Sequence, residues 1–515
     1  MAQRDEPNVA TTSGAYDAMA HRWILVNTVL EGTEAMRAAG ESFTPRYERE
    51  SSQHWEERVH RTVLANFVEL TSDHLTGQAL KVPPEPDEDV PEDIQALLED
   101  VDGQGTGFAT FARNVFKSAV DNAFSHVFVD MPTPRMTENG APRTLADDRS
   151  EGLRPYWIHV PATSLIFAHS EIIDGKEVLT HIRMREDAVE MDGWAEVVRE
   201  RIRVVQLGFD EAGNTAVVWE LWELMEVSKN KKEWVTVDGG VMDIDEIPLV
   251  TFYTAKDGFM VGKPPLTDLA YLNVAHWQSS SDQRNVLTVA RFPLLAASGA
   301  LDESADSGDG PIQVGPHSFM YMPDPQGKFY YVEHTGAAID AGRNDLKDLE
   351  EQMAGYGSEF LKQRPANEGV TARVLDSSES LSSLQVWVID FKDALENCFR
   401  LTAKWLGKEE DGGGSVLLDS DELGLDEADT AHLDTLVKAR AARDISRHAF
   451  LTELKRRGVL SDAFDIDEDE GLRDDEAPSE EMAGMFGPGG EMNAPGQQPD
   501  DDEDEDEDDA TTDEA

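Results

Sequence analysis

The chain is poor in cysteine and has no long apolar stretch. A single cysteine, Cys398, among 515 residues excludes a disulfide framework and a cysteine-based zinc site, and it suits a reducing compartment. A membrane-spanning helix needs about 18–20 uninterrupted apolar residues, but the best run, Val286 to Leu301, is interrupted by Arg291 and Pro293. The polar first 22 residues lack the apolar centre of a signal peptide. These absences predict a soluble protein that is made in the cytoplasm and does not contact a membrane.

Basic residues are also scarce. The chain has 45 Lys and Arg against 103 Asp and Glu, which gives a formal charge of −58. Residues 461–515 hold 24 acidic side chains and one basic one, including the unbroken acidic run Asp500–Asp509, and this composition predicts a disordered tail. DNA affinity comes largely from Lys and Arg that neutralise phosphates, so the charge argues against a sequence-specific DNA-binding protein. Adaptation to high salt is an alternative explanation of the acidity.

Helical and β-type patterns alternate in the first half of the chain. Apolar residues recur at helical spacing in three segments, 16–30, 53–80 and 108–122. The second segment stops at Pro83 and Pro84 and is followed by an acidic, proline-rich link over 84–91. A buried strand is expected over 125–130.

The region from 156 to 254 has a β texture. Six short runs are rich in β-branched and aromatic residues: 156–160, 178–185, 202–208, 215–224, 233–237 and 248–253. Turn signals such as Asp174-Gly175, Asp192-Gly193 and Asp238-Gly239 lie between them. This pattern predicts an antiparallel meander, and together with the helices it predicts an α+β fold.

Long helices dominate the second half. The helix expected over 266–291 would measure about 40 Å at about 1.5 Å per residue, and its inner stretch, 278–285, is small and polar. Such a stretch can line a surface that is exposed to water, or it can pack closely against copies of itself. An irregular or β insertion follows over 292–338. Further helices are expected over 343–361, 377–406, 427–440 and 444–457, with a break over 362–370 and a glycine-rich hinge over 411–415.

The sequence offers no convincing catalytic, metal or cofactor site. Gly103-x-Gly105-x-Gly107 has the glycines of a phosphate loop but no following Lys-Ser/Thr pair, so a turn that leads into a helix is the preferred interpretation. Asp465-x-Asp467-x-Asp469 begins like a calcium loop but has glycine at the seventh position, which favours an acidic linker. Cys398 lies on the apolar stripe of a helix, where a structural thiol is expected. We therefore expect a protein that is not an enzyme and that has no cofactor.

The order of the elements resembles that of portal proteins of tailed bacteriophages, the head-to-tail connectors, over about residues 16–460. Local segments carry the resemblance to one portal branch: 23–47 with Gly32, Gly40 and Pro45; 127–132 (Val-Phe-Val-Asp-Met-Pro); 154–157 (Arg-Pro-Tyr-Trp); 265–273 continuing through Ser281-Asp282; and 292–299 from Phe292-Pro293. None of these segments contains a catalytic motif.

The resemblance implies a ring, usually of twelve subunits, at one capsid vertex of the virion. Such a ring is the channel for DNA packaging and genome ejection. Double-stranded DNA passes through it without sequence-specific binding. The implied partners are the terminase large subunit, a head–tail adaptor, and the major capsid and scaffold proteins.

The resemblance also implies a division of the chain into an α/β wing, long stem helices, a small clip insertion, a helical crown and a tail. The implied bounds are 1–265 for the wing, 266–292 for the first stem helix, 293–338 for the clip, 339–361 for the second stem helix, 362–371 for the tunnel loop, 372–406 for a long helix that links wing and crown, 407–460 for the crown and 461–515 for the tail.

Two sets of side chains would then meet DNA. The tunnel-loop set is Lys362, Gln363, Arg364 and Asn367, and the stem-lining set is Ser279, Ser280, Asp282 and Arg284. The two tunnel-loop cations can contact phosphates transiently, or they can simply complete the preceding helix, because cations favour helix C-termini. Two other classes remain open, namely another acidic virion structural protein, such as a head–tail adaptor or capsid component, and an enzyme with a site of an unfamiliar kind.

Overall fold

The computed structural model divides the chain into two units, 1–425 and 426–515, and each is described by itself. The described residues are 7–132, 153–209, 215–228, 231–291, 294–298, 325–332, 336–359, 382–408, 412–418, 436–438, 440 and 445–456. The tunnel-loop set and the acidic tail lie outside them. In the second unit, helix α12 (Arg447–Arg456) lies within the segment 444–457 that was expected to be helical.

Short helices form the beginning of the first unit. They are α1 (Gly14–Leu30), α2 (Thr33–Ala38), the 3₁₀ turn η1 (Gly40–Ser42), α3 (Ser52–Arg61) and α4 (Phe67–Ala79). The prediction of one helix over 53–80 is therefore wrong. Thr62 is extended, and the Asn66 side chain accepts a hydrogen bond from the Glu69 amide, which caps a new helix.

The link over 84–91 and the expected hinge over 411–415 pack against each other. Strand β1 (Glu85–Pro86) pairs antiparallel with β16 (Val416–Leu417), and helix α5 (Glu92–Leu97) follows β1. A Cβ on Gly414, whose φ is +79°, would lie 2.6 Å from the Val90 Cα. The described residues 412–415 of the expected hinge therefore pack closely against the link.

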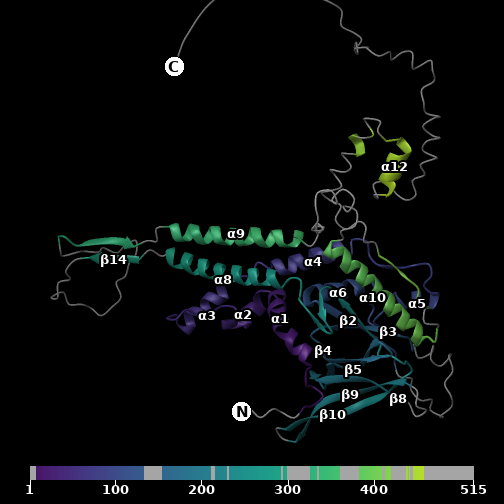
Figure 1. The fold of residues 1–515 in the computed structure, drawn as a ribbon. Helices are drawn as coiled ribbons and strands as arrows, with labels where there is room; N and C mark the ends of the chain where they lie inside the picture. The colour runs from purple at the N-terminus through teal and green to yellow at the C-terminus, as the bar shows by residue number, and fades with distance from the viewer. Residues whose placement is uncertain are drawn as a thin grey trace, which may run out of the picture. The chain divides into compact units, whose positions relative to one another are not determined.

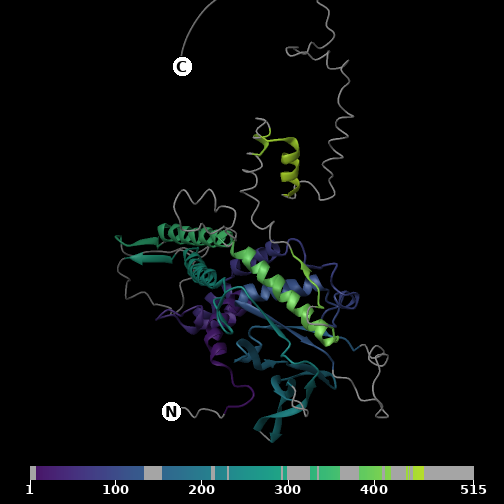
Figure 2. The same ribbon diagram turned by 45° about the vertical axis from the view of Figure 1, so that its right-hand side comes forward.

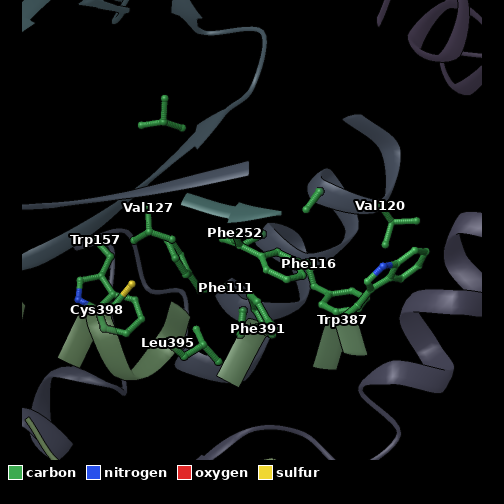
Figure 3. Packing of buried hydrophobic residues seen from close by; sticks show 14 of the residues in the cluster. Phe111, Phe116, Val120, Val127, Trp157, Phe252, Trp387, Phe391, Leu395 and Cys398 are labelled. Carbon is green, nitrogen blue, oxygen red and sulfur yellow. The ribbon is translucent and has the colours of Figure 1, made fainter. Parts of the chain in front are cut away.

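A three-stranded antiparallel sheet forms the centre of the core. Its order is β11 (Leu249–Tyr253), β2 (Phe124–Asp130) and β3 (Tyr156–Pro161), and helices α6 (Phe108–Asn122) and α10 (Ser383–Trp405) pack against it. Figure 3 shows Phe391 of α10 against Phe116 and Phe252, and the three rings contact one another. Each fully buried side chain of this size contributes about 1.5–3 kcal/mol. A capping box of Ser382 and Gln385 fixes the start of α10.

A five-stranded antiparallel sheet lies beside this core. Its order is β10 (Lys231–Met242), β9 (Thr215–Ser228), β8 (Arg201–Phe209), β5 (Lys176–Arg185) and β4 (Leu165–Ile173), with a separate hairpin, β6 (Ala188–Asp192) and β7 (Ala195–Arg199), between β5 and β8 along the chain. A further small hairpin is β12 (Lys256–Gly258) with β13 (Val261–Gly262).

The α+β prediction is confirmed, but the single meander is not. The first and last of the six predicted runs became β3 and β11, which pair with β2 in the other sheet. Asp238-Gly239 is not a turn, since it lies inside β10 at a register shift. Glycine suits this position because a Cβ on Gly239 would lie 2.9 Å from the carbonyl oxygen of Trp219.

Two long helices, α8 (Thr267–Ala290) and α9 (Ala337–Glu359), lie side by side, as Figures 1 and 2 show. An antiparallel hairpin of β14 (Leu294–Ser298) and β15 (Lys328–Val332) lies beyond their ends. The helix expected over 266–291 and a β insertion after it are thus confirmed. The second helix begins six residues before the expected start at Arg343, directly after Gly336, whose φ is +77°.

Candidate functional site

Helix α9 buries only one narrow stripe of its surface. The stripe repeats at three and four residues and consists of Ile339, Gly342, Leu346, Leu349, Met353 and Tyr356. Met353 is fully buried, and the stripe packs toward α8. The other side chains described on this helix are exposed, so α9 meets α8 along one apolar seam and has wide polar flanks of its own.

The exposed flank of α9 is acidic. Its charged side chains are Asp340, Arg343, Asp345, Lys347, Asp348, Glu350 and Glu351. Its two cations already have local partners, since Arg343 lies 3.3 Å from Asp340 and Lys347 lies 3.4 Å from Glu351. A phosphate near this flank would therefore meet mainly carboxylates.

The small polar stretch of α8 is used for close packing within the chain. Ser279 Oγ donates a hydrogen bond to Asp345 Oδ2 of α9 at 2.6 Å. Gln283 Nε2 donates to the Ile339 carbonyl at 2.9 Å, and a Cβ on Gly342 would lie 2.2 Å from Gln283 Oε1. Small residues here let the two helix backbones approach each other.

A buried ion pair joins the other side of α8 to helix α3 and the loop before it. The Arg58 guanidinium donates two hydrogen bonds of 2.9 Å to the Glu50 carboxylate, and the two side chains are only 4% and 7% exposed. Arg58 Nη1 also donates to Ser281 Oγ at 3.1 Å, and Tyr47 donates to Asp282. We call Tyr47, Glu50, Arg58, Ser281 and Asp282 the base cluster.

The electrostatics of the base cluster follow from this geometry. The hydrogen bonds from Arg58 lower the pKa of Glu50. Burial and the neighbouring Asp282 carboxylate raise the pKa of Tyr47 to about 12. The cluster therefore keeps its ion pair charged at neutral pH and ties α8 to α3.

The stem-lining set is brought together on one stretch of α8, but its members contact their own chain. Ser280 is buried, and Arg284 Nη1 donates to the Arg61 carbonyl at 3.3 Å. Ser279 and Asp282 have the partners given above. Their role as a channel lining stays a prediction, and the tunnel-loop set lies outside the described residues.

Sequence reasoning missed Arg58 and Glu50, because their eight-residue spacing carries no helical or strand signal.

The other candidate motifs are structural. The amide of Gly105 donates to Asp100 at 2.7 Å, and that of Gln104 donates to Asp102 at 2.9 Å. Two of the amides that a phosphate loop would offer are therefore already bonded to carboxylates of the same loop. The loop leads into α6, so the turn interpretation is confirmed. Burial raises the pKa of the Cys398 thiol, which fits a structural residue.

Two general features concern only the part of the chain that the structure describes. There, no three side chains of His, Cys, Asp or Glu are grouped as a metal ion would require. None of the described helices combines the length and the apolar character needed to cross a bilayer.

Comparison with known proteins adds a family segment and two structural likenesses. A family model described as a domain of unknown function, DUF4055, matches residues 265–406, which include α8, α9 and α10. No curated protein matches the chain. The solved neck of an empty GTA particle, computed with C6 symmetry, is similar at 13% identity and a TM-score of 0.37, over 82% of this chain and 97% of the other. The neck of a native GTA particle, computed with C12 symmetry, is similar at 12% identity and a TM-score of 0.37, over 81% and 98%.

Proposed function

We propose that this chain is a ring-forming structural subunit of a phage-like particle and acts as a portal, the DNA channel at one capsid vertex. The observation that carries the proposal is the helix pair α8–α9. It has one apolar seam, an acidic flank and a β hairpin beyond its ends. The order of elements and the segments that resemble portal proteins support the same function.

The charge of the pair suits a conduit through which DNA slides. Tight contacts between cations and phosphates would hold DNA in place, whereas an acidic wall lowers adhesion. The exposed flank of α9 would be free to meet copies of the chain or the DNA. The base cluster would keep each helix pair at a fixed angle to its own α/β body during this passage.

The proposed partners follow from this role. The hairpin β14–β15 and the insertion around it would face the terminase large subunit and a head–tail adaptor. The α/β body would contact the major capsid and scaffold proteins, and double-stranded DNA would pass through without sequence-specific binding. The subunit would act in the virion as a structural protein without catalytic activity.

Electron microscopy of the purified full-length protein tests this function. We expect annular particles with a bore wide enough for duplex DNA, and a native mass of about twelve subunits. Particles without a central hole, or a monomer, would overturn the proposal. A stable hexamer would favour the alternative of a head–tail adaptor or capsid component.

A further inference from the structure

The hairpin β6–β7, which we call the arm (residues 188–199), has an uncovered apolar face. Val189 pairs directly with Val198 across the two strands, and Met191 pairs with Glu196. The two valines and Met191 are 61–68% exposed, and Trp194 at the turn is fully exposed. The other face of the arm carries charge, because Glu190 binds both Arg199 and Arg201. The arm is therefore amphipathic.

An uncovered arm of this kind needs a partner. A lone two-stranded hairpin is at best marginally stable in water, and clustered exposed apolar side chains mark protein interaction sites. The indole of Trp194 is fully exposed, so it does not pack against the described part of its own chain. Its exposed ring is available to the surface of another molecule.

The five-stranded sheet carries a hollow of matching chemistry. The hollow has a volume of about 760 Å³. Its apolar lining includes Val204, Trp222 and Trp234, and residues 7–9 form one edge. His181 and Arg183 also line it, and Arg183 Nη1 donates to the Asn8 and Val9 carbonyls at 3.1 and 3.0 Å. Two indoles and the positive charges of Arg183 and Lys232 suit an occupant with an aromatic side chain and a carboxylate.

The charges of the arm and the hollow are also complementary. Asp192 and Glu196 flank Trp194 at the tip of the arm, and neither has an ion-pair partner in the described part of the chain. The hollow contains Arg183 and Lys232.

Two carboxylates in the hollow already have local donors. Glu220 accepts a hydrogen bond from Trp222 Nε1, and Glu233 is paired with Lys231. Lys232 lies 4.0 Å from Glu200, at the outer limit of an ion pair. Arg183 Nη1 donates to the Asn8 and Val9 carbonyls, but no carboxylate in the described part of the chain pairs with it. Arg183 and Lys232 are therefore the positive charges that an incoming acidic tip would meet.

We propose that the arm of one copy of this chain docks into the hollow of a neighbouring copy. Trp194 would enter between Trp222 and Trp234, and the acidic tip would reach Arg183 and Lys232. The choice of a second copy as the occupant rests on the proposed function, because a ring needs two different, complementary surfaces on each subunit. The arm and the hollow supply such a pair.

Paired cysteines in the full-length chain test the contact. Ala195→Cys places a thiol at the tip of the arm and keeps Trp194, and Gln206→Cys places one in the hollow. The natural Cys398 is buried and does not interfere. Mild oxidation of the double variant should give a ladder of covalent oligomers. The matched control, Gln206→Cys with Ile172→Cys on an exposed hairpin end, should give no ladder.

A charge reversal gives an independent readout. Asp192→Lys with Glu196→Lys should raise the protein concentration needed for oligomers at least about tenfold, because like charges would meet. Adding Lys232→Glu should recover part of the loss. Glu171→Lys with Glu177→Lys, on the hairpin β4–β5, should change little.

The outcomes separate this contact from the proposed function. Annular particles that give no ladder and tolerate the charge reversal would overturn the arm contact and leave the portal proposal standing. Cross-linked oligomers that form open chains instead of closed rings would support the arm contact and overturn the portal proposal. A protein that stays monomeric in every variant would overturn both.

Discussion

Arg58 shows how a single buried charge organises the region around α8. Its guanidinium satisfies Glu50 with two hydrogen bonds and reaches Ser281 of α8. Removing one partner of a buried pair leaves the other charge uncompensated, which costs about 3–5 kcal/mol. The value of the pair therefore lies less in its own attraction than in the penalty for breaking it.

Arg58→Met should lower the free energy of unfolding by about 3–5 kcal/mol, measured by urea unfolding with tryptophan fluorescence. Arg61→Met is the matched control on the same helix, because its pair with Glu57 is exposed. The control should cost less than about 0.5 kcal/mol. Equal effects of the two substitutions would contradict the role of the base cluster.

Asp121 predicts a dependence of stability on pH. Burial raises the pKa of this carboxyl from 3.8 to about 6, although Ser72 donates to it. The folded state therefore favours the protonated form, and stability present below pH 3.8 is lost as the pH rises through about 6. Asp121→Asn removes this loss.

The advantage of Asp121→Asn over the parent protein should grow by about 1 kcal/mol between pH 5 and pH 8, measured by urea unfolding at both values. Asp268→Asn serves as the control, because this carboxylate is more than half exposed and is not among the groups that shift the pKa of Asp121. A constant difference between Asp121→Asn and the parent across this range would show that Asp121 has an ordinary pKa in the folded protein.

At the scale of elements, the packing of the segment 412–418 against 84–91 depends on glycine. Gly414 has a left-handed φ of +79°, and a side chain there would collide with the Val90 backbone. Gly77 lies within α4 with open space around it. The same substitution should therefore have opposite effects at the two positions.

Gly414→Ala should destabilise the protein by at least about 1–3 kcal/mol, whereas Gly77→Ala should stabilise it by about 0.5–1 kcal/mol. Thermal unfolding of both variants measures the difference. If Gly414→Ala left the stability unchanged, the segments 412–418 and 84–91 would not be in close contact at this position.

At the scale of the whole molecule, the proposed ring would bring the two tunnel-loop cations close to DNA. In so acidic a chain, Lys362 and Arg364 would then make transient phosphate contacts. Lys362→Glu with Arg364→Glu should reduce DNA retention or packaging severalfold while annular particles still form, as measured by particle DNA content and electron microscopy. Unchanged packaging would show that these two residues do not contact DNA in the channel.

The acidic tail should not contribute to assembly. The run Asp500–Asp509 has no apolar side chain to bury. A chain that ends after residue 499 should therefore form the same particles as the full chain, by native mass and by electron microscopy. Loss of those particles on truncation would assign the tail a structural role.

Local patterns were sufficient to predict most elements. The helical spacing over 108–122 predicted α6 with its observed bounds, because the repeat of apolar side chains is a property of the segment itself. The helix expected over 266–291 matches α8 to within one residue at each end. The break at Thr62–Asn66 was missed, since the cap at Asn66 depends on one side-chain hydrogen bond. Strand β4 and the arm were missed because their polar residues weaken the β signal.

The sequence by itself determined the acidity, the single inert thiol, the α+β class and the long helices, because these depend on composition and short-range periodicity. Only the tertiary structure decided what the polar stretch of α8 does. Arg58 and Ser281, which share a hydrogen bond, are 223 positions apart, and no local pattern encodes such a contact. The arm and the hollow likewise became visible only when folding showed which apolar side chains stay uncovered.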